Sequence, residues 1–301
     1  MKMNINLALC CDDKFVMPVL VCLTSIFENN KKYGFRVYII TAGITKQNKE
    51  KFEHLAKIYH QCILVKNIDS SRFAVLPSRD RYVVATYYRF ILPELLTESK
   101  VLFLDGDTII TSDICDLWQA DIDDYACAAV EDQRCDDVKL YNRFYLQTTY
   151  FNAGVLLINL DYWRSHNITQ KLFKYSIENY NKLLYQDQDA LNVVLSGKVK
   201  YLSYTYNFQM EWYGDEYTNT AHFSKWEDIR KIKEHPVIIH YCVAAKPWFK
   251  ECKLPIKEQW IKYAEMYEFI DYRETHLLSF ISRVMHVLVY GVGMKILQRV
   301  A

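Results

Sequence analysis

Short apolar runs alternate with segments of helical periodicity along the first third of the chain. Residues 5–11, 36–41 and 62–65 are apolar over lengths typical of strands. Residues 46–59 have a helical pattern, and an earlier helix is predicted from Pro18, with apolar residues at Val19, Leu20, Leu23, Ile26 and Phe27. This order predicts a βαβαβ unit. Right-handed crossovers would place its strands in one parallel sheet, with ligands at their carboxyl ends.

Two carboxylates follow the next apolar run, Val101 to Leu104. The run is continuous rather than alternating, which favours a central strand covered on both faces. Residues two apart in extended backbone point to the same side, so Asp105 and Asp107 can face one ligand, and Gly106 lets the main chain approach it. Paired oxygen donors suit Mg²⁺ or Mn²⁺, which could hold a diphosphate. The alternative is a turn with two solvated aspartates, because Asp-Gly is a common turn signal.

Polar side chains accompany other predicted elements. Asp12 and Asp13 follow the first strand, where Asp12 could contact a nucleotide or cap a helix. That turn lacks the Gly-X-Gly-X-X-Gly pattern of dinucleotide-binding folds. A predicted helix over 83–91 carries Arg89, which could pair with a phosphate or form a surface salt bridge.

The middle and later parts of the chain predict four more strands, over 126–130, 155–158, 200–206 and 236–240. The small residues 152–154 precede the second of these strands and would let a ligand approach. The polar run 184–192 leads into a helix and is either a capping cluster or a substrate-facing site. His240 ends the last strand, and periodicity alone would assign it a structural role.

Composition narrows the class of protein. The 301 residues are 51% hydrophobic, which suits one large domain or one domain with an appendage. Lys and Arg total 37 against 36 Asp and Glu, so no global field favours nucleic acid. The nine cysteines include no Cys-X-X-Cys pair and are typical of buried small hydrophobes in a reducing compartment. The first residues have too short an apolar stretch for a secretory signal, which predicts cytoplasmic residence.

Six motifs occur in order up to residue 248. They are Cys11-Asp12-Asp13, Thr86-Tyr-Tyr-Arg89, Phe103-Leu-Asp105-Gly-Asp107, Tyr150-Phe-Asn152-Ala-Gly-Val-Leu-Leu-Ile-Asn159, Gln186-Asp187-Gln188-Asp189-Ala-Leu-Asn192 and His240-Tyr-Cys-Val-Ala-Ala-Lys246-Pro-Trp248. In these motifs the chain resembles glycosyltransferase family eight, the retaining nucleotide-sugar transferases that include bacterial lipopolysaccharide galactosyl- and glucosyltransferases and, more distantly, glycogenin. The resemblance strengthens the metal interpretation of the two aspartates.

The resemblance implies an α/β fold of the GT-A type. We expect a single domain over 1–270, with a mostly parallel central sheet flanked by helices, and an amphipathic, basic helical tail over 271–301. By position, Asp105, Asp107 and His240 would hold Mn²⁺, or Mg²⁺, against the donor diphosphate. The same resemblance implies that uridine contacts Asp12 and Asp13 and that the diphosphate contacts Lys246. It assigns the donor sugar to Arg89, Asp132, Asn152, Asp187 and Gln188.

Two positions depart from the family pattern. Val243 stands where a glycine often follows the metal histidine by three residues, and Lys14 replaces an asparagine beside the two acidic residues. Lys246 agrees with its implied role on chemical grounds, because a point charge beside His240 suits a phosphate.

The function implied is metal-dependent transfer of galactose or glucose from a UDP-sugar to a hydroxyl of a cell-surface glycan, with retention at the anomeric carbon. Leaving-group stabilisation and positioning would carry catalysis. Gln188 is a poor nucleophile because its amide is neutral, so same-face attack assisted by the departing phosphate is favoured, with Asp187 as the alternative nucleophile. Two other functions remain open: a nucleotide-sugar binding protein without turnover, suggested by Val243, and a glycogenin-like self-glucosylating protein.

Segments outside the motifs should contact the acceptor and could move. Acceptor contacts are expected from residues 70–82, 134–149 and 211–233. Residues 69–80 and 211–215 lack a clear period and either close over the donor to exclude water or form static loops.

The tail predicts attachment to a membrane surface. No acidic residue occurs between His276 and Ala301, and the longest stretch free of Lys and Arg, Val284 to Met294, is far shorter than the roughly 20 residues of a spanning helix. We expect the tail to lie on the anionic inner face of the cell membrane, near a lipid-linked glycan acceptor. The alternative is a helix that packs on the core or in a dimer interface.

Overall fold

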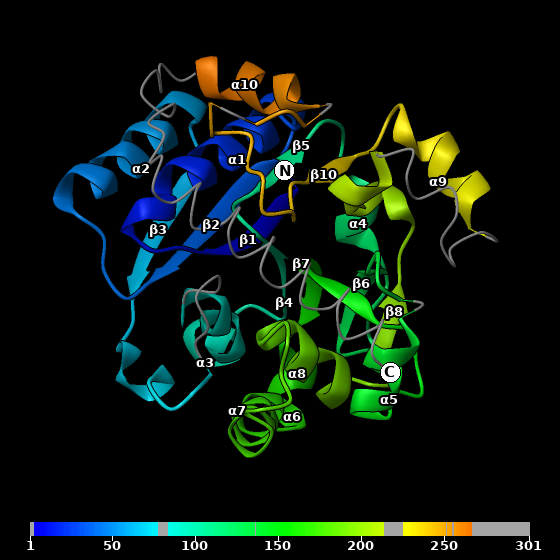
Figure 1. The fold of residues 1–301 in the computed structure, drawn as a ribbon. Coiled ribbons are helices and arrows are strands. Elements are labelled where there is room, and N and C mark those ends of the chain that lie inside the picture. Colours follow the sequence, from blue (N-terminus) through cyan, green and yellow to red (C-terminus); the bar gives the residue numbers. More distant parts are fainter. Residues whose placement is uncertain are drawn as a thin grey trace. The chain divides into compact units, whose positions relative to one another are not determined.

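The computed structural model describes residues 3–77, 84–135, 137–213, 225–250, 252–254 and 256–266. Their contacts divide the chain into two compact units, Met1–Cys242 and Val243–Ala301. The first unit contains two sheets (Figure 1). The second contains one described helix, α10 (Lys257–Glu265), in which Trp260 is buried and lies 5.7 Å from the Trp248 ring, centroid to centroid.

The larger sheet has seven strands in the order β3-β2-β1-β4-β7-β6-β8. Their bounds are β1 Asn4–Cys10, β2 Gly34–Thr41, β3 Cys62–Asn67, β4 Lys100–Leu104, β6 Cys127–Glu131, β7 Phe151–Asn159 and β8 Val199–Tyr201. Strand β7 runs antiparallel to both of its neighbours, and the other pairs are parallel. The predicted mostly parallel sheet is therefore confirmed.

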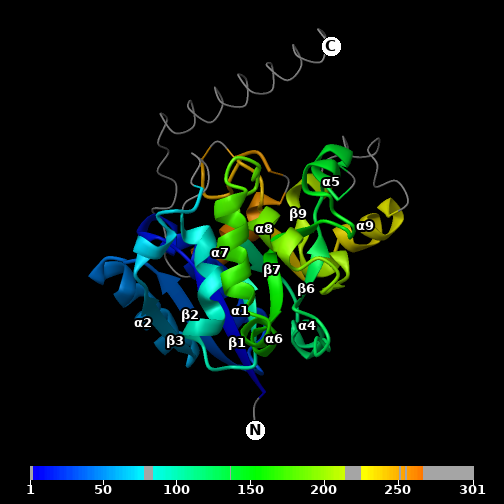
Figure 2. The ribbon, with the colours of Figure 1, turned by 90° about the horizontal axis from the view of Figure 1, so that it is seen from below.

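Helices cover both faces of this sheet. Helices α1 and α2 lie on one face, and α3, α6, α7 and α8 lie on the other, as Figures 1 and 2 show from two directions. The helix bounds are α1 Val16–Asn29, α2 Lys46–Tyr59, α3 Leu92–Leu95, α4 Cys115–Gln119, α5 Val138–Phe144, α6 Leu160–Ser165, α7 Ile168–Glu178, α8 Asp187–Val194 and α9 Trp226–Lys233. Because β4 is covered on both sides, every residue from Val101 to Leu104 is almost fully buried, as its continuous apolar pattern predicts.

Helix α2 shows how local sequence fixes an element. Thr45 caps its first turn, with Oγ1 accepting a hydrogen bond from the Asn48 amide at 3.3 Å. His60 ends it in the left-handed conformation, and the His60 N–H reaches carbonyls of the last turn. Only Phe52 and Leu55 of its side chains are buried, so the helix lies at the surface.

A second sheet, not expected from the sequence, has three strands. The order is β5 (Thr108–Ile110), β10 (Ile238–His240) and β9 (Phe208–Gln209). Strand β10 is antiparallel to β5, with His240 opposite Thr108, and parallel to β9. This sheet brings a histidine from late in the chain beside the residues that follow β4.

Several sequence-based boundaries were wrong. The strand expected over 200–206 ends at Tyr201 and is followed by a 3₁₀ helix, η4 (Tyr204–Tyr206). The helix expected over 83–91 is a 3₁₀ helix, η3 (Val84–Ile91), which is followed directly by α3. Residues 152–154 lie within β7 rather than before it.

The cysteines differ from one another in burial. Four cysteines are buried, namely Cys11, Cys22, Cys127 and Cys135, whereas Cys62 is exposed, so the expectation of buried thiols holds for part of the set. Among the described residues, no helix has the length and apolar character needed to cross a membrane. The tail over 271–301 lies outside the described residues.

Candidate functional site

Asp105 and Asp107 belong to a tight turn between β4 and β5. The Thr108 amide and hydroxyl both donate to the Asp105 carbonyl oxygen, at 3.2 and 2.8 Å. Gly106 is required by close packing: a Cβ there would lie 2.6 Å from Val19 Cγ2, at the start of α1. The turn therefore places two carboxylates at the carboxyl end of a buried central strand.

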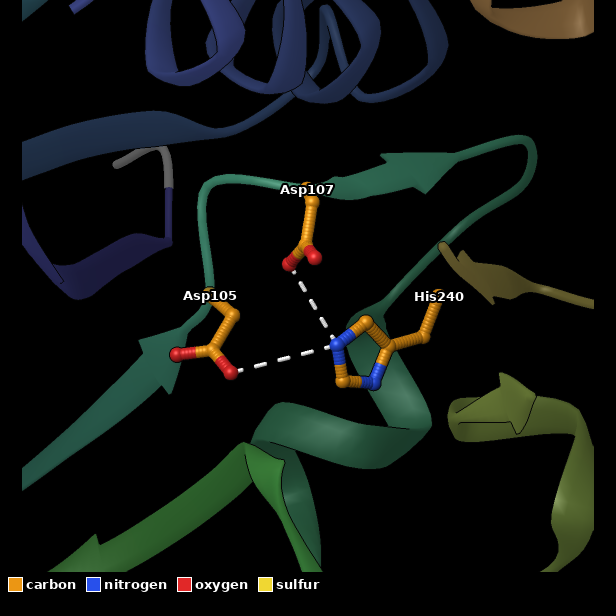
Figure 3. Close-up of side chains that lie close together, drawn as sticks. All are labelled: Asp105, Asp107 and His240. Atoms are coloured by element: carbon orange, nitrogen blue, oxygen red, sulfur yellow. Dashed lines mark ion pairs between the residues drawn. The ribbon is translucent and has the colours of Figure 1, made fainter. Parts of the chain in front are cut away.

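His240 completes a group that we call the carboxylate–histidine cluster, consisting of Asp105, Asp107 and His240 (Figure 3). The His240 Nε2 atom lies 3.3 Å from Asp107 Oδ1 and 3.8 Å from Asp105 Oδ2. One ligand atom from each residue lies within 4.8 Å of the other two. Two carboxylate oxygens and one imidazole nitrogen suit Mn²⁺ and are acceptable to Mg²⁺. The donor set thus fits a divalent cation.

Gly154 explains how β7 accommodates the imidazole. A Cβ at this position would lie 2.1 Å from His240 Cε1 and 2.7 Å from Nδ1, so the ring occupies space that any other residue would fill. The Gly154 carbonyl oxygen also accepts a hydrogen bond from the Asp105 amide at 2.8 Å. The small residues of this motif therefore admit a histidine of the same chain.

Arg89 links the cluster to a third carboxylate, that of Asp187. Its guanidinium pairs with Asp105 at 2.8 Å and with Asp187 at 3.2 Å, and donates to the Ala153 carbonyl oxygen at 2.5 Å. It also lies 4.2 Å from the centroid of the Phe103 ring. Arg89 is 3% exposed, so the surface salt bridge considered from sequence is excluded. Burial raises the pKa of the Asp187 carboxyl to about 6, although the Arg89 guanidinium opposes the shift.

A buried polar network lies beside this pair. Asp132 Oδ2 accepts hydrogen bonds from the side-chain amides of Asn152 and Gln188, at 3.0 and 3.1 Å. The Gln188 amide oxygen accepts from the Ala153 amide at 2.9 Å, so both ends of the Gln188 side chain are engaged. Burial alone would raise the pKa of Asp132, but charge and hydrogen bonds from Arg134, together with the Asn152 bond, lower it. The carboxylate can therefore remain ionised in the interior.

The two acidic residues after β1 have structural partners. Asp12 Oδ1 accepts from the Phe15 amide at 2.9 Å, so Asp12 caps the 3₁₀ helix η1 (Asp13–Phe15). Asp13 Oδ1 accepts from the Thr45 amide at 2.6 Å and the Asn48 side chain at 2.9 Å, which tie it to the start of α2. These contacts establish the capping role that the sequence allowed for Asp12. Uridine contacts by either residue stay predictions.

Lys246 belongs to the second compact unit, Val243–Ala301. Its Nζ atom lies 5.9 Å from the centroid of the Trp248 ring in the same unit. Its contact with a diphosphate stays a prediction.

Two residues near the site were missed from the sequence. Asn207 is fully buried and contacts the imidazole of the cluster. Arg134 forms a two-pronged ion pair with Asp132 and stacks on the Tyr185 ring at 3.9 Å. The contacts of Asn207 with His240 and of Arg134 with Tyr185 depend on tertiary structure, whereas Asp132 lies only two residues from Arg134. The only feature of the sequence that marks Asn207 is its position as a polar residue between the aromatic residues Tyr206 and Phe208.

Comparisons with known proteins identify a family and several relatives for this chain. The chain matches the model for glycosyl transferase family 8 over residues 6–252. A lipopolysaccharide 1,3-galactosyltransferase of Salmonella typhimurium is 27% identical over 266 residues, covering 85% of this chain and 77% of the relative. A lipopolysaccharide 1,2-glucosyltransferase of Escherichia coli is 29% identical over 252 residues, covering 82% and 73%. The crystal structure of the galactosyltransferase LgtC with donor and acceptor sugar analogs has a TM-score of 0.79 and 27% identity, covering 88% of this chain and 96% of LgtC.

The mostly parallel sheet, with carboxylates at the end of its central strand, defines a glycosyltransferase of the GT-A type. The family match covers most of the chain, and the protein belongs to glycosyl transferase family 8.

Proposed function

We propose that this protein is a divalent-metal-dependent, retaining hexosyltransferase that moves galactose or glucose from a UDP-sugar to a hydroxyl of a cell-surface glycan. The observation that carries the proposal is the carboxylate–histidine cluster, joined through Arg89 to the buried carboxylate of Asp187. The named activities of the Salmonella and E. coli relatives support a hexose donor and a lipid-linked glycan acceptor.

In this proposal a diphosphate approaches the cluster from the side of Asp105, its most exposed member. The Asp105 side chain is 31% exposed, whereas those of Asp107 and His240 are 10% and 4% exposed. A cation held there, Mn²⁺ in our proposal, would supply positive charge against the leaving UDP. Lys246 would add a second positive charge at the diphosphate, and Asp12 and Asp13 would contact uridine.

The residues assigned to the donor sugar form two groups, and both contact the main chain of Ala153. Arg89 pairs with Asp187, and Asn152 and Gln188 both bind Asp132. Because these side chains are at most 9% exposed and bind one another, hydroxyl groups of a hexose would take the place of some of these contacts, which fixes the sugar for reaction.

The hydrogen bonds of Gln188 bear on the mechanism. Its amide oxygen already accepts a backbone hydrogen bond, which leaves this neutral group a poor nucleophile. We therefore favour attack by the acceptor hydroxyl on the same face as the departing phosphate, which takes the proton. Asp187 is the alternative nucleophile, but its carboxylate is buried and paired with Arg89.

Acceptor-free hydrolysis tests this proposal. Purified protein with Mn²⁺ should slowly release free sugar from UDP-galactose or UDP-glucose, and the faster donor identifies the hexose. Proton NMR should detect the α-anomer first, because retention preserves the donor configuration. Mn²⁺-dependent UDP binding without sugar release from either donor would instead indicate a binding protein. An increase in intact mass after incubation with UDP-glucose would indicate self-glucosylation.

A further inference from the structure

We infer that Asn207 is a positioning residue that holds His240 in the Nδ1–H tautomer, so that the Nε2 lone pair faces the two aspartates. The inference rests on the proposed function, since it assigns an outer partner to the proposed metal ligand. His240 Nδ1 lies 3.0 Å from Asn207 Oδ1, and both residues are buried. Neutral imidazole carries one N–H, and the partner of one nitrogen decides which atom bears it.

Two groups with a fixed role, the Gly154 backbone amide and the Asp132 carboxylate, determine the direction of the hydrogen bonds of Asn152 and Asn207. Asn152 Oδ1 accepts from the Gly154 backbone amide at 2.9 Å, which can only donate. Asn152 Nδ2 lies 3.0 Å from the Asp132 carboxylate, which accepts when ionised. These two partners fix the orientation of the Asn152 amide: its oxygen points toward Gly154 and its nitrogen toward Asp132.

The orientation of Asn207 follows from that of Asn152. Asn152 Oδ1 also lies 2.9 Å from one atom of the Asn207 side-chain amide. Because an oxygen acceptor requires a nitrogen donor, that atom is Asn207 Nδ2. Asn207 Oδ1 must then face His240 Nδ1. An amide oxygen cannot donate, so Nδ1 carries a proton, and in the neutral ring, which has one N–H, Nε2 then carries none. Nε2 is the atom that lies 3.3 and 3.8 Å from the aspartate oxygens of the cluster.

This chain of hydrogen bonds joins the proposed metal site to the proposed sugar site. It runs from His240 through Asn207 and Asn152 to Asp132, and each of these residues is at most 3% exposed. Water therefore has little access to replace a missing partner, and loss of one member leaves a buried polar atom unsatisfied. Outer partners of metal-binding histidines fix the ring and tune its affinity for metal.

The tautomer can be read without metal or donor. Protein labelled with ¹⁵N-histidine is observed by long-range ¹H–¹⁵N NMR in EDTA at a pH where imidazole is neutral, and His240 is assigned by its absence in His240→Gln. The wild-type ring should be the Nδ1–H tautomer. An Nε2–H wild-type ring would overturn the inference whether or not the protein transfers sugar. An Nδ1–H ring in a protein that fails to release sugar would leave the inference standing and reject the proposed function.

Two substitutions then separate the hydrogen bond from packing. Asn207→Leu has a similar shape but no acceptor, so the Nδ1–H preference should be lost and Mn²⁺ should bind about 10- to 100-fold more weakly. Asn207→Asp keeps the acceptor at His240 Nδ1 and loses the donor to Asn152 Oδ1, so it should lower the melting temperature but keep the tautomer, with Mn²⁺ affinity within about threefold of wild type. Electron paramagnetic resonance of free Mn²⁺ measures both affinities.

Asn30→Leu is the matched control. Asn30 is 1% exposed and binds Ile26, Ser112 and Ile114 through its side chain, so its loss also removes buried hydrogen bonds. It should lower the melting temperature without changing Mn²⁺ affinity. A folded Asn207→Leu protein with wild-type tautomer and affinity would overturn the inference. If that variant does not fold, the wild-type spectrum and Asn207→Asp decide, and a lost Nδ1–H preference in Asn207→Asp counts against the inference.

Discussion

At Gly154 a single hydrogen atom in place of a side chain makes room for the proposed metal ligand. A Cβ there would lie 2.1 Å from His240 Cε1, and the ring cannot move away without losing its contact with Asn207. We predict that Gly154→Ala weakens Mn²⁺ binding by at least about tenfold, a loss comparable to that of an outer partner of a metal ligand. Titration calorimetry would measure the change.

Gly197→Ala provides the control for this prediction. Gly197 has a φ of +75°, and no atom of the described residues would lie within 4 Å of a Cβ added there, so the substitution strains the backbone without touching the cluster. It should lower the free energy of unfolding by about 1 kcal/mol and leave Mn²⁺ affinity unchanged. Equal Mn²⁺ affinity in Gly154→Ala and wild type would contradict the steric role of Gly154.

At the scale of elements, the sequence predicted the helices and strands that have a clear helical pattern or a continuous apolar run. Helix α2 spans Lys46–Tyr59, as its helical pattern predicted, and β4 follows from its apolar run. The antiparallel direction of β7 could not be predicted, because apolar periodicity is the same in both directions. In the second sheet, the strand expected over 236–240 is found as β10 (Ile238–His240), whereas β5 and β9 carry too few residues for a periodic signal.

Some residues of the candidate site could likewise be predicted from the sequence, and others could not. The pair Asp105 and Asp107 follows from residue spacing along one strand end. His240 was proposed only from the family resemblance, because its approach to the aspartates depends on the pairing of β10 with β5. Asn207 was missed because it contacts His240 across 33 positions of sequence.

Both segments considered as lids have anchored elements within their described parts. In η2 (Ser70–Phe73), Phe73 is fully buried and lies 5.0 Å from the Tyr88 ring. In η5 (Met210–Tyr213), Trp212 is fully buried against Phe208, at 5.4 Å between ring centroids. Closure of either segment must therefore leave these aromatic anchors in place.

Hydrogen exchange tests whether these anchored parts of the two segments stay in place. The amides of Ala74 and Leu76 bind carbonyls within the η2 turn, at 3.1 and 3.0 Å, and should exchange equally slowly with and without UDP and Mn²⁺. The corresponding peptide over residues 210–213 should behave in the same way. A large ligand-dependent change at Leu76 would show that the anchor itself moves, which contradicts this account.

At the scale of the whole molecule, the tail is the part proposed to bind a membrane. Residues 271–301 lie outside the described residues, and the proposal rests on their basic, amphipathic sequence. Replacement of Arg283, Lys295 and Arg299 by glutamate should abolish co-sedimentation with anionic liposomes, because charge attraction is lost. UDP-sugar hydrolysis should remain close to wild type.

Neutral phosphatidylcholine liposomes are the control for the tail, since they remove the charge attraction but keep the apolar interface. Weak sedimentation of the wild type with neutral vesicles and strong sedimentation with anionic vesicles is expected. Wild-type protein that does not sediment with anionic vesicles would refute peripheral attachment and favour a tail packed on the core.

The central claim is that the carboxylate–histidine cluster holds the cation on which sugar transfer depends. Its most direct test is Mn²⁺-dependent release of sugar from the preferred UDP-sugar by EDTA-treated wild type and by the double variant Asp105→Asn, Asp107→Asn. Wild type should be inactive in EDTA and regain activity with added Mn²⁺, whereas the folded double variant should stay inactive at every Mn²⁺ concentration. Wild-type rates in EDTA, or in the double variant, would contradict the account.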